Sequence, residues 1–120
     1  MRIWSMVMKQ GSLGNKGNLL MTLVSEILDT SKAVTNNRTI SDVLTHAMTE
    51  LGELAQEVQI AEGKSYKQEG ADGVIGEALD VINCMVDMIY IHYGSLGNED
   101  FMVALNARKL AKWKEKAIKR

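Results

Sequence analysis

The chain of 120 residues has no proline, a single cysteine and no apolar run long enough to span a membrane. Turns and edge strands recruit proline, so its absence argues against an all-β protein of this length, whereas long helices do not need it. The single cysteine, Cys84, excludes an internal disulfide and a zinc site built on several cysteines. We therefore expect a cytoplasmic protein of long helices, with no membrane-spanning segment.

An excess of charge of one sign is also missing, because 14 basic and 15 acidic side chains give a formal net charge of −1. That balance argues against a strongly cationic protein that binds nucleic acid. The two signs are nevertheless separated along the chain. Residues 1–107 hold 7 basic and 14 acidic side chains, whereas residues 108–120 hold 7 basic and 1 acidic. The composition is that of one globular domain over residues 1–120.

Apolar residues recur at helical spacing in four segments, which predicts an all-α protein. The expected helices cover about residues 19–34, a stretch from a cap at Thr39 or Ser41 to about 61, and about residues 73–93 and 99–118. Residues 1–18 are expected to pack through their apolar side chains, with a loop over 11–17. Four helices with short connections predict an antiparallel four-helix bundle or a pair of helical hairpins.

The second and third predicted helices each carry an apolar stripe, which we expect to form the core. In the second helix the stripe consists of Leu44, Ala47, Leu51, Leu54 and Val58. In the third helix it consists of Ile75, Leu79, Ile82, Val86 and Ile89.

Both of these helices also carry acidic side chains away from the apolar stripe. In the second helix, Glu50, Glu53 and Glu57 fall within about 60° of one another at roughly 100° per residue, and His46 lies one turn earlier. In the third helix, Glu77, Asp80 and Asp87 form a similar stripe, with Asn83 at its edge.

Basic side chains are missing from these acidic faces, unlike the mixed-sign faces of ordinary solvated helices. No Lys or Arg occurs between Thr39 and Lys64, or between Lys67 and Arg108. Carboxylates that face one another raise one another's pKa, and a hard divalent cation removes that conflict. Oxygen ligands select Mg²⁺, Mn²⁺ or Ca²⁺ over zinc and copper, and Mg²⁺ completes its shell with water and substrate phosphates. A di-iron centre would need Glu-x-x-His motifs, which neither cluster has.

The spacing of these acids resembles the signature of the all-α nucleotide pyrophosphohydrolases, the superfamily of MazG-like enzymes. Glu50-x-x-Glu53 is followed after 23 residues by Glu77-x-x-Asp80. The surrounding stretches 49–57 and 76–82 also look MazG-like, and residues 108–113 are similar to the basic end of the family's last helix. The resemblance covers about residues 40–116.

The resemblance implies a bundle that assembles as a homodimer or homotetramer and hydrolyses nucleoside triphosphates to monophosphates and pyrophosphate. It implies that the carboxylates of the two motifs bind Mg²⁺, with Mn²⁺ as a substitute. These metal ligands would be Glu50, Glu53, Glu77 and Asp80. The resemblance also makes Glu53 the residue that orients or deprotonates the attacking water.

Three further residues are expected to contact the substrate. Asn83 lies one turn after Asp80 and is placed to contact the nucleotide, although an ordinary exposed asparagine fits the pattern equally well. Lys109 and Lys112 are placed to meet the departing phosphates, or simply complement the dipole at the end of the helix. His46 is expected to be a hydrogen-bonded neighbour of the carboxylates rather than a catalyst.

A second class of function stays open at this point. The chain could be a non-catalytic helical module that binds a partner or nucleic acid through its basic C-terminal helix, with the acidic stripes as plain surface. The preference for base and sugar is not predicted, because no motif in the first helix or in the 62–72 connection bears on it.

Overall fold

The computed structural model describes residues 16–93 and 99–118, and over these ranges the chain consists of four helices without a strand. They are α2 (Lys16–Ala33), α3 (Ile40–Ala61), α4 (Gly73–Tyr93) and α5 (Glu99–Ile118). The all-α prediction is confirmed, and the helix bounds lie close to the predicted ones. Lys16 and Gly17 belong to α2 rather than to the expected loop. The expectations for residues 1–15 and 94–98 lie outside the described residues.

Helix α3 begins at a capping box, which settles the choice between the two predicted caps. The side chain of Thr39 accepts a hydrogen bond from the backbone N–H of Asp42 at 3.1 Å, and the Asp42 carboxylate accepts one from the Thr39 N–H at 2.9 Å. Two amide groups without partners inside the helix are satisfied in this way. These hydrogen bonds lower the pKa of Asp42.

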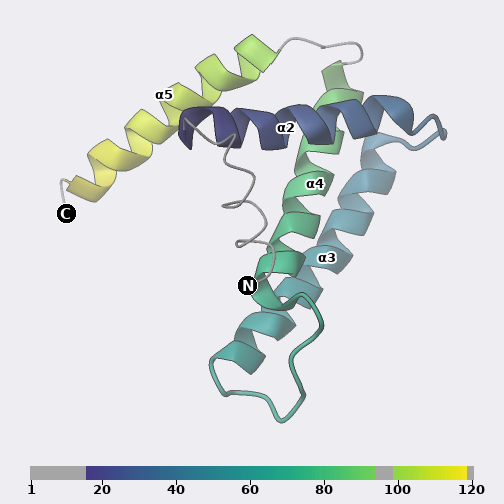
Figure 1. The fold of residues 1–120 in the computed structure, drawn as a ribbon, viewed down its shortest axis with the longest axis vertical. Coiled ribbons are helices and arrows are strands. Elements are labelled where there is room, and N and C mark those ends of the chain that lie inside the picture. The colour runs from purple at the N-terminus through teal and green to yellow at the C-terminus, as the bar shows by residue number, and fades with distance from the viewer. Residues whose placement is uncertain (1–15, 94–98, 119–120) are drawn as a thin grey trace.

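Helices α3 and α4 form an antiparallel hairpin, and α2 crosses α4 near the end of the hairpin that lies away from the 62–72 connection (Figure 1). The buried contact between α3 and α4 centres on Val43, Ala47 and Cys84, with Met88 and Ile91 packed beside them. None of the described side chains is completely buried. The core formed by the described residues is therefore small.

The predicted apolar stripes are only partly buried in the structure. On α3, Ala47 is buried and Leu54 half-buried, whereas Leu44, Leu51 and Val58 are exposed. The prediction that the whole stripe forms the core is therefore wrong for this chain by itself. Helix α4 instead packs against the side of α3 that carries Val43, Ala47 and Glu57, about a quarter-turn away from the exposed leucines.

Helix α5 extends from the end of α4 toward the C-terminus (Figure 1) and has no extensive contact with the other described helices. Between Asp100 and Ile118 its residues are exposed, apart from the half-buried Met102 and Leu105. In the described part of the chain α5 therefore adds little to a bundle. None of the described helices is both long and apolar enough to cross a membrane.

Candidate carboxylate metal site

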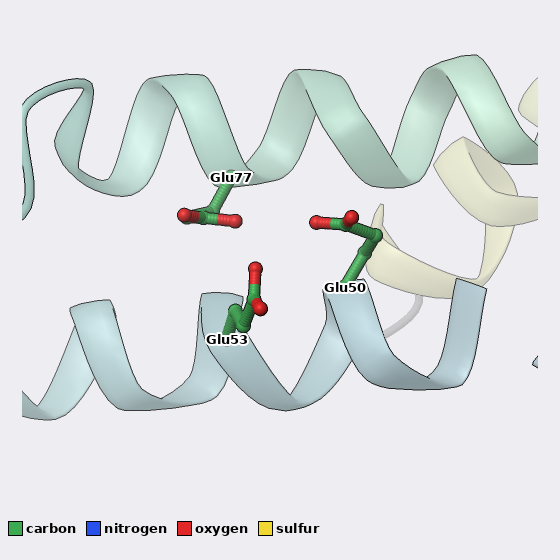
Figure 2. Close-up of side chains that lie close together, drawn as sticks. All are labelled: Glu50, Glu53 and Glu77. Atoms are coloured by element: carbon green, nitrogen blue, oxygen red, sulfur yellow. The ribbon is translucent and has the colours of Figure 1, made fainter. Parts of the chain in front are cut away.

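Three of the four predicted metal ligands come together between α3 and α4. Glu50 and Glu53 project from neighbouring turns of α3 and Glu77 from the facing turn of α4, so that all three side chains enter the same space (Figure 2). One carboxylate oxygen from each residue lies within 4.8 Å of the others. Side chains 27 and 24 positions apart thus meet because the helical hairpin places their turns opposite each other.

The glycine before Glu77 allows the N-terminal turn of α4 to form. A Cβ atom at Gly76 would collide with the Cβ of Asp72, whose backbone carbonyl accepts a hydrogen bond from the Gly76 N–H at 3.1 Å. Gly52, between the two motif acids of α3, has open space around its Cα. A close approach by a neighbouring group therefore explains Gly76 but not Gly52.

Glu50 and Glu77 are partly withdrawn from water without full compensation. The Oε2 atoms of both residues are buried and have no hydrogen-bond partner in the described part of the chain. The Glu50 side chain is 14% exposed, and its Oε1 lies 3.2 Å from Nε2 of the exposed His46. The sequence predicted that His46 is a neighbour of the carboxylates, and in the structure it lies beside Glu50.

Burial raises the pKa of both Glu50 and Glu77, and the nearby charges of Glu53 and Asp80 raise it further. The positive charge that His46 can carry acts in the opposite direction on Glu50. Two desolvated carboxyls that repel their neighbours are an unfavourable arrangement unless a cation joins them.

Asp80, the fourth predicted ligand, lies at the edge of this cluster. Its side chain is exposed, and its charge reaches both Glu50 and Glu77, but it does not belong to the close group of three. Asn83 lines a neighbouring cavity of about 490 Å³ between α2 and α4, together with Cys84 and Asp87. Burial raises the pKa of Cys84, and the charges of Glu50, Asp80 and Asp87 raise it further.

The two predicted phosphate-binding lysines do not join the cluster within the described chain. Lys109 and Lys112 are exposed on α5, which has no extensive contact with α3. Lys109 instead lines an apolar groove beside α4.

Glu57, the third acid of the α3 stripe, has a structural partner that the sequence did not indicate. Its buried carboxylate accepts a hydrogen bond from the Gly70 N–H at 2.7 Å, which fixes the 62–72 connection against α3. Only the fold brings Gly70 to this position, so helical spacing could not predict the contact.

Asp87, the last acid of the α4 stripe, forms an ion pair with Arg38 that the sequence also did not reveal. Nε and Nη2 of Arg38 donate to the two carboxylate oxygens at 2.8 and 2.6 Å. The same guanidinium donates to the backbone carbonyls of Ser31 and Val34. The hydrogen bond from Arg38 is the main reason why the pKa of Asp87 is lowered. In the sequence, the available indication of this ion pair was the position of Arg38, an isolated basic residue just before the acidic stretch.

Comparisons of this chain with protein-family models, with curated proteins and with solved structures find no match. The motif residues and their geometry are therefore what indicates the function of this chain.

Proposed function

We propose that this chain is a Mg²⁺-dependent nucleotide pyrophosphohydrolase that converts nucleoside triphosphates into monophosphates and pyrophosphate. The observation that carries the proposal is the pair of buried, unpartnered oxygens of Glu50 and Glu77, which lie beside Glu53. A site of oxygen donors with excess negative charge fits a hard divalent cation. In the proposal Glu50, Glu53 and Glu77 hold Mg²⁺, and Asp80 is an outer ligand at the edge.

A cation bound there would neutralise substrate phosphates and make a bound water more acidic. The chain's own residues supply positioning and proton transfer. Glu53 is the most exposed of the three acids, so a substrate and its attacking water can reach it. In the proposed step the water oxygen bonds to phosphorus, Glu53 accepts a water proton, and the bond to the departing pyrophosphate breaks.

The cavity between α2 and α4, which Asn83 lines one turn after Asp80, supports a nucleoside-binding role. Its volume of about 490 Å³ is within the range of small-molecule sites. Leu23, Ile27 and Val34 line it with apolar surface, and Asn83 adds an amide group. In the proposal the base and sugar occupy this cavity while the phosphates extend to the carboxylates, with Asn83 as the nucleotide contact.

The direct test is to incubate the protein with Mg²⁺ and each common NTP and dNTP, and to measure pyrophosphate separately from phosphate. We expect pyrophosphate and the monophosphate in equal amounts. Glu53→Gln should lower the rate by at least about 100-fold, the scale of a lost general base. Glu62→Gln is the matched control, because Glu62 is exposed and pairs with Lys64 away from the cluster.

Folded protein that releases no pyrophosphate from any nucleotide would contradict the proposal. DNA binding that weakens with salt and disappears on deletion of residues 108–120 would favour the non-catalytic alternative instead.

A further inference from the structure

The first turn of α4 determines where the Glu77 carboxylate lies, because Glu77 is only four residues after Gly73, where the helix begins. Glu77 comes close to Glu50 and Glu53 of α3, since one oxygen of each residue lies within 4.8 Å of the others. Mg²⁺ holds its oxygen ligands at about 2.0–2.1 Å and requires nearly octahedral geometry. A displacement of the start of α4 by about 1 Å would therefore spoil the contact of Glu77 with a shared ion.

The connection before α4 is held to α3 through the carboxylate of Glu57. Its Oε1 atom accepts a hydrogen bond from the Gly70 N–H at 2.7 Å. The two groups are also closely packed, because a Cβ atom at Gly70 would lie 3.1 Å from the same oxygen. Gly70 precedes the first residue of α4 by three positions. The hydrogen bond therefore fixes the chain just before the turn that carries Glu77.

Glu57 is buried although it is an acid. It is 7% exposed, whereas Glu53, one turn earlier on the same helix, is exposed. No Lys or Arg of the described residues forms an ion pair with Glu57. A buried carboxylate without a cation lowers stability, and one hydrogen bond to a backbone N–H offsets only part of that loss. Packing alone therefore does not explain an acid at this position, where an apolar side chain would pack better.

Glu57 lies on the same face of α3 as the proposed metal ligands. Glu50, Glu53 and Glu57 are spaced by three and four residues, so Glu57 is about 6 Å along the helix from Glu53. Glu53 lies opposite Glu77 of α4 (Figure 2). One turn closer to the 62–72 connection, Glu57 contacts Gly70. This face of α3 thus supplies two metal ligands and also the contact that holds the start of the facing helix.

We propose that Glu57 is a positioning residue of the metal site: its buried carboxylate holds the Gly70 N–H, and this contact places the first turn of α4 so that Glu77 reaches the ion. Glu57 acts through Glu77, because Glu57 itself does not belong to the close group of three carboxylates. The role rests on the proposed function, which supplies the ion. It goes beyond that function, since the family resemblance gives Glu57 no role.

The test compares two substitutions of Glu57 that remove the same negative charge. Glu57→Gln keeps an oxygen that can accept from the Gly70 N–H, whereas Glu57→Met has a similar length but no oxygen. Calorimetric titration of Mn²⁺ into metal-free protein at pH 7 measures the affinity. We expect Glu57→Gln to bind almost as the wild type does. Glu57→Met should bind about 10–100-fold more weakly, the effect of removing a group that orients a metal ligand.

Two measurements on the metal-free protein distinguish positioning from a purely structural role. Glu57→Met should melt no lower than Glu57→Gln in a chelator, because an apolar side chain replaces a buried polar one. Hydrogen exchange at the Gly70 amide should be faster in Glu57→Met than in Glu57→Gln. Weaker metal binding without a lower melting temperature is the result expected of a positioning residue. If metal binding weakens only together with stability, Glu57 is an ordinary structural residue and the proposal is wrong.

The control and the remaining outcomes separate this role from the proposed function. Glu62→Met is the matched control, because it makes the same change at the exposed C-terminal cap of α3 and should leave Mn²⁺ binding unchanged. A wild type that binds Mn²⁺, with Glu57→Met binding as tightly as Glu57→Gln, would overturn the positioning role and leave the metal site intact. A wild type that does not bind Mn²⁺ would overturn the metal site and the role of Glu57 together.

A substitution on the other side of the contact serves if Glu57→Met does not fold. Gly70 does not have a positive φ angle, so alanine fits its backbone, but the added Cβ atom would press on Oε1 of Glu57. Gly70→Ala should therefore also weaken Mn²⁺ binding relative to the wild type. Unchanged binding in a folded Gly70→Ala variant would show that this contact does not position Glu77.

Discussion

Helix α4 holds acids in two different environments, ten residues apart. Asp87 shares two hydrogen bonds with Arg38, and that contact lowers its pKa. Glu77 faces Glu50 and Glu53 without a Lys or Arg from α3 or α4, and burial and neighbouring charge raise its pKa. Along the same helix, the surroundings thus favour the charged form of Asp87 and disfavour the charged form of Glu77.

The difference shows that the unpaired cluster is not a general consequence of this fold. The chain brings a guanidinium to α4 where an acid needs a permanent partner. At the cluster, the buried Oε2 atoms of Glu50 and Glu77 have no hydrogen-bond partner in the described part of the chain. Unpaired buried charge lowers stability, and such an arrangement is typical of sites that bind a ligand or perform chemistry. The comparison identifies a structural tie at Arg38, and it is the reason why we propose a metal site at the cluster.

The largest expected effect on stability comes from breaking the structural tie. Asp87→Asn removes the negative charge and leaves the Arg38 side chain, which is only 16% exposed, without its ionic partner. We expect the free energy of unfolding to fall by about 2–4 kcal/mol. Urea unfolding at pH 7 measures the loss, and Asp29→Asn on the exposed face of α2 is the control. A loss no greater than that of the control would mean that the pair contributes nothing to the fold.

A substitution in the cluster of Glu50, Glu53 and Glu77 should change stability less, and should increase it rather than lower it. Glu77→Gln removes one of the repelling charges, so the metal-free variant should melt a few degrees above the wild type at pH 7. Thermal unfolding in a chelator measures the difference, and Glu62→Gln should leave the melting temperature unchanged. A variant that is less stable than the wild type would show that Glu77 is held by interactions that favour its charge.

The directions of the pKa shifts predict how the stability differences between the wild type and the Glu77→Gln and Asp87→Asn variants depend on pH. The pKa of Glu77 lies above its ordinary value of 4.5, so its charge penalises the folded state at neutral pH. That penalty should disappear as the pH falls through the raised pKa, and the wild type should then match Glu77→Gln. The pKa of Asp87 lies below its ordinary value of 3.8, so its stabilising contribution persists to lower pH and is lost only as the pH falls through that lowered value.

The sequence predicted the helices well, because their signals are local. Thr39 with Asp42 starts α3, and the glycine-containing 62–72 connection separates it from α4. The family resemblance grouped Glu50, Glu53 and Glu77 with Asp80, and the antiparallel hairpin brings the first three of these side chains together.

Local sequence signals could not predict which faces of the helices pack against one another. The stripe with Leu44 and Leu51 fits a core face, yet both leucines are exposed because α4 packs on another side of α3. The Arg38–Asp87 pair joins positions 49 residues apart, and no helical period predicts such a contact. The separation of α5 from α3 depends on packing of whole helices, so the roles expected for Lys109 and Lys112 stay predictions.

The most direct test of the central claim is a calorimetric titration of Mg²⁺, repeated with Mn²⁺, into metal-free protein at pH 7. We predict saturable binding to the wild type and to Glu62→Gln, and no measurable binding to Glu77→Gln. A wild type that binds neither ion, or a Glu77→Gln variant that binds as the wild type does, would contradict a metal site between α3 and α4.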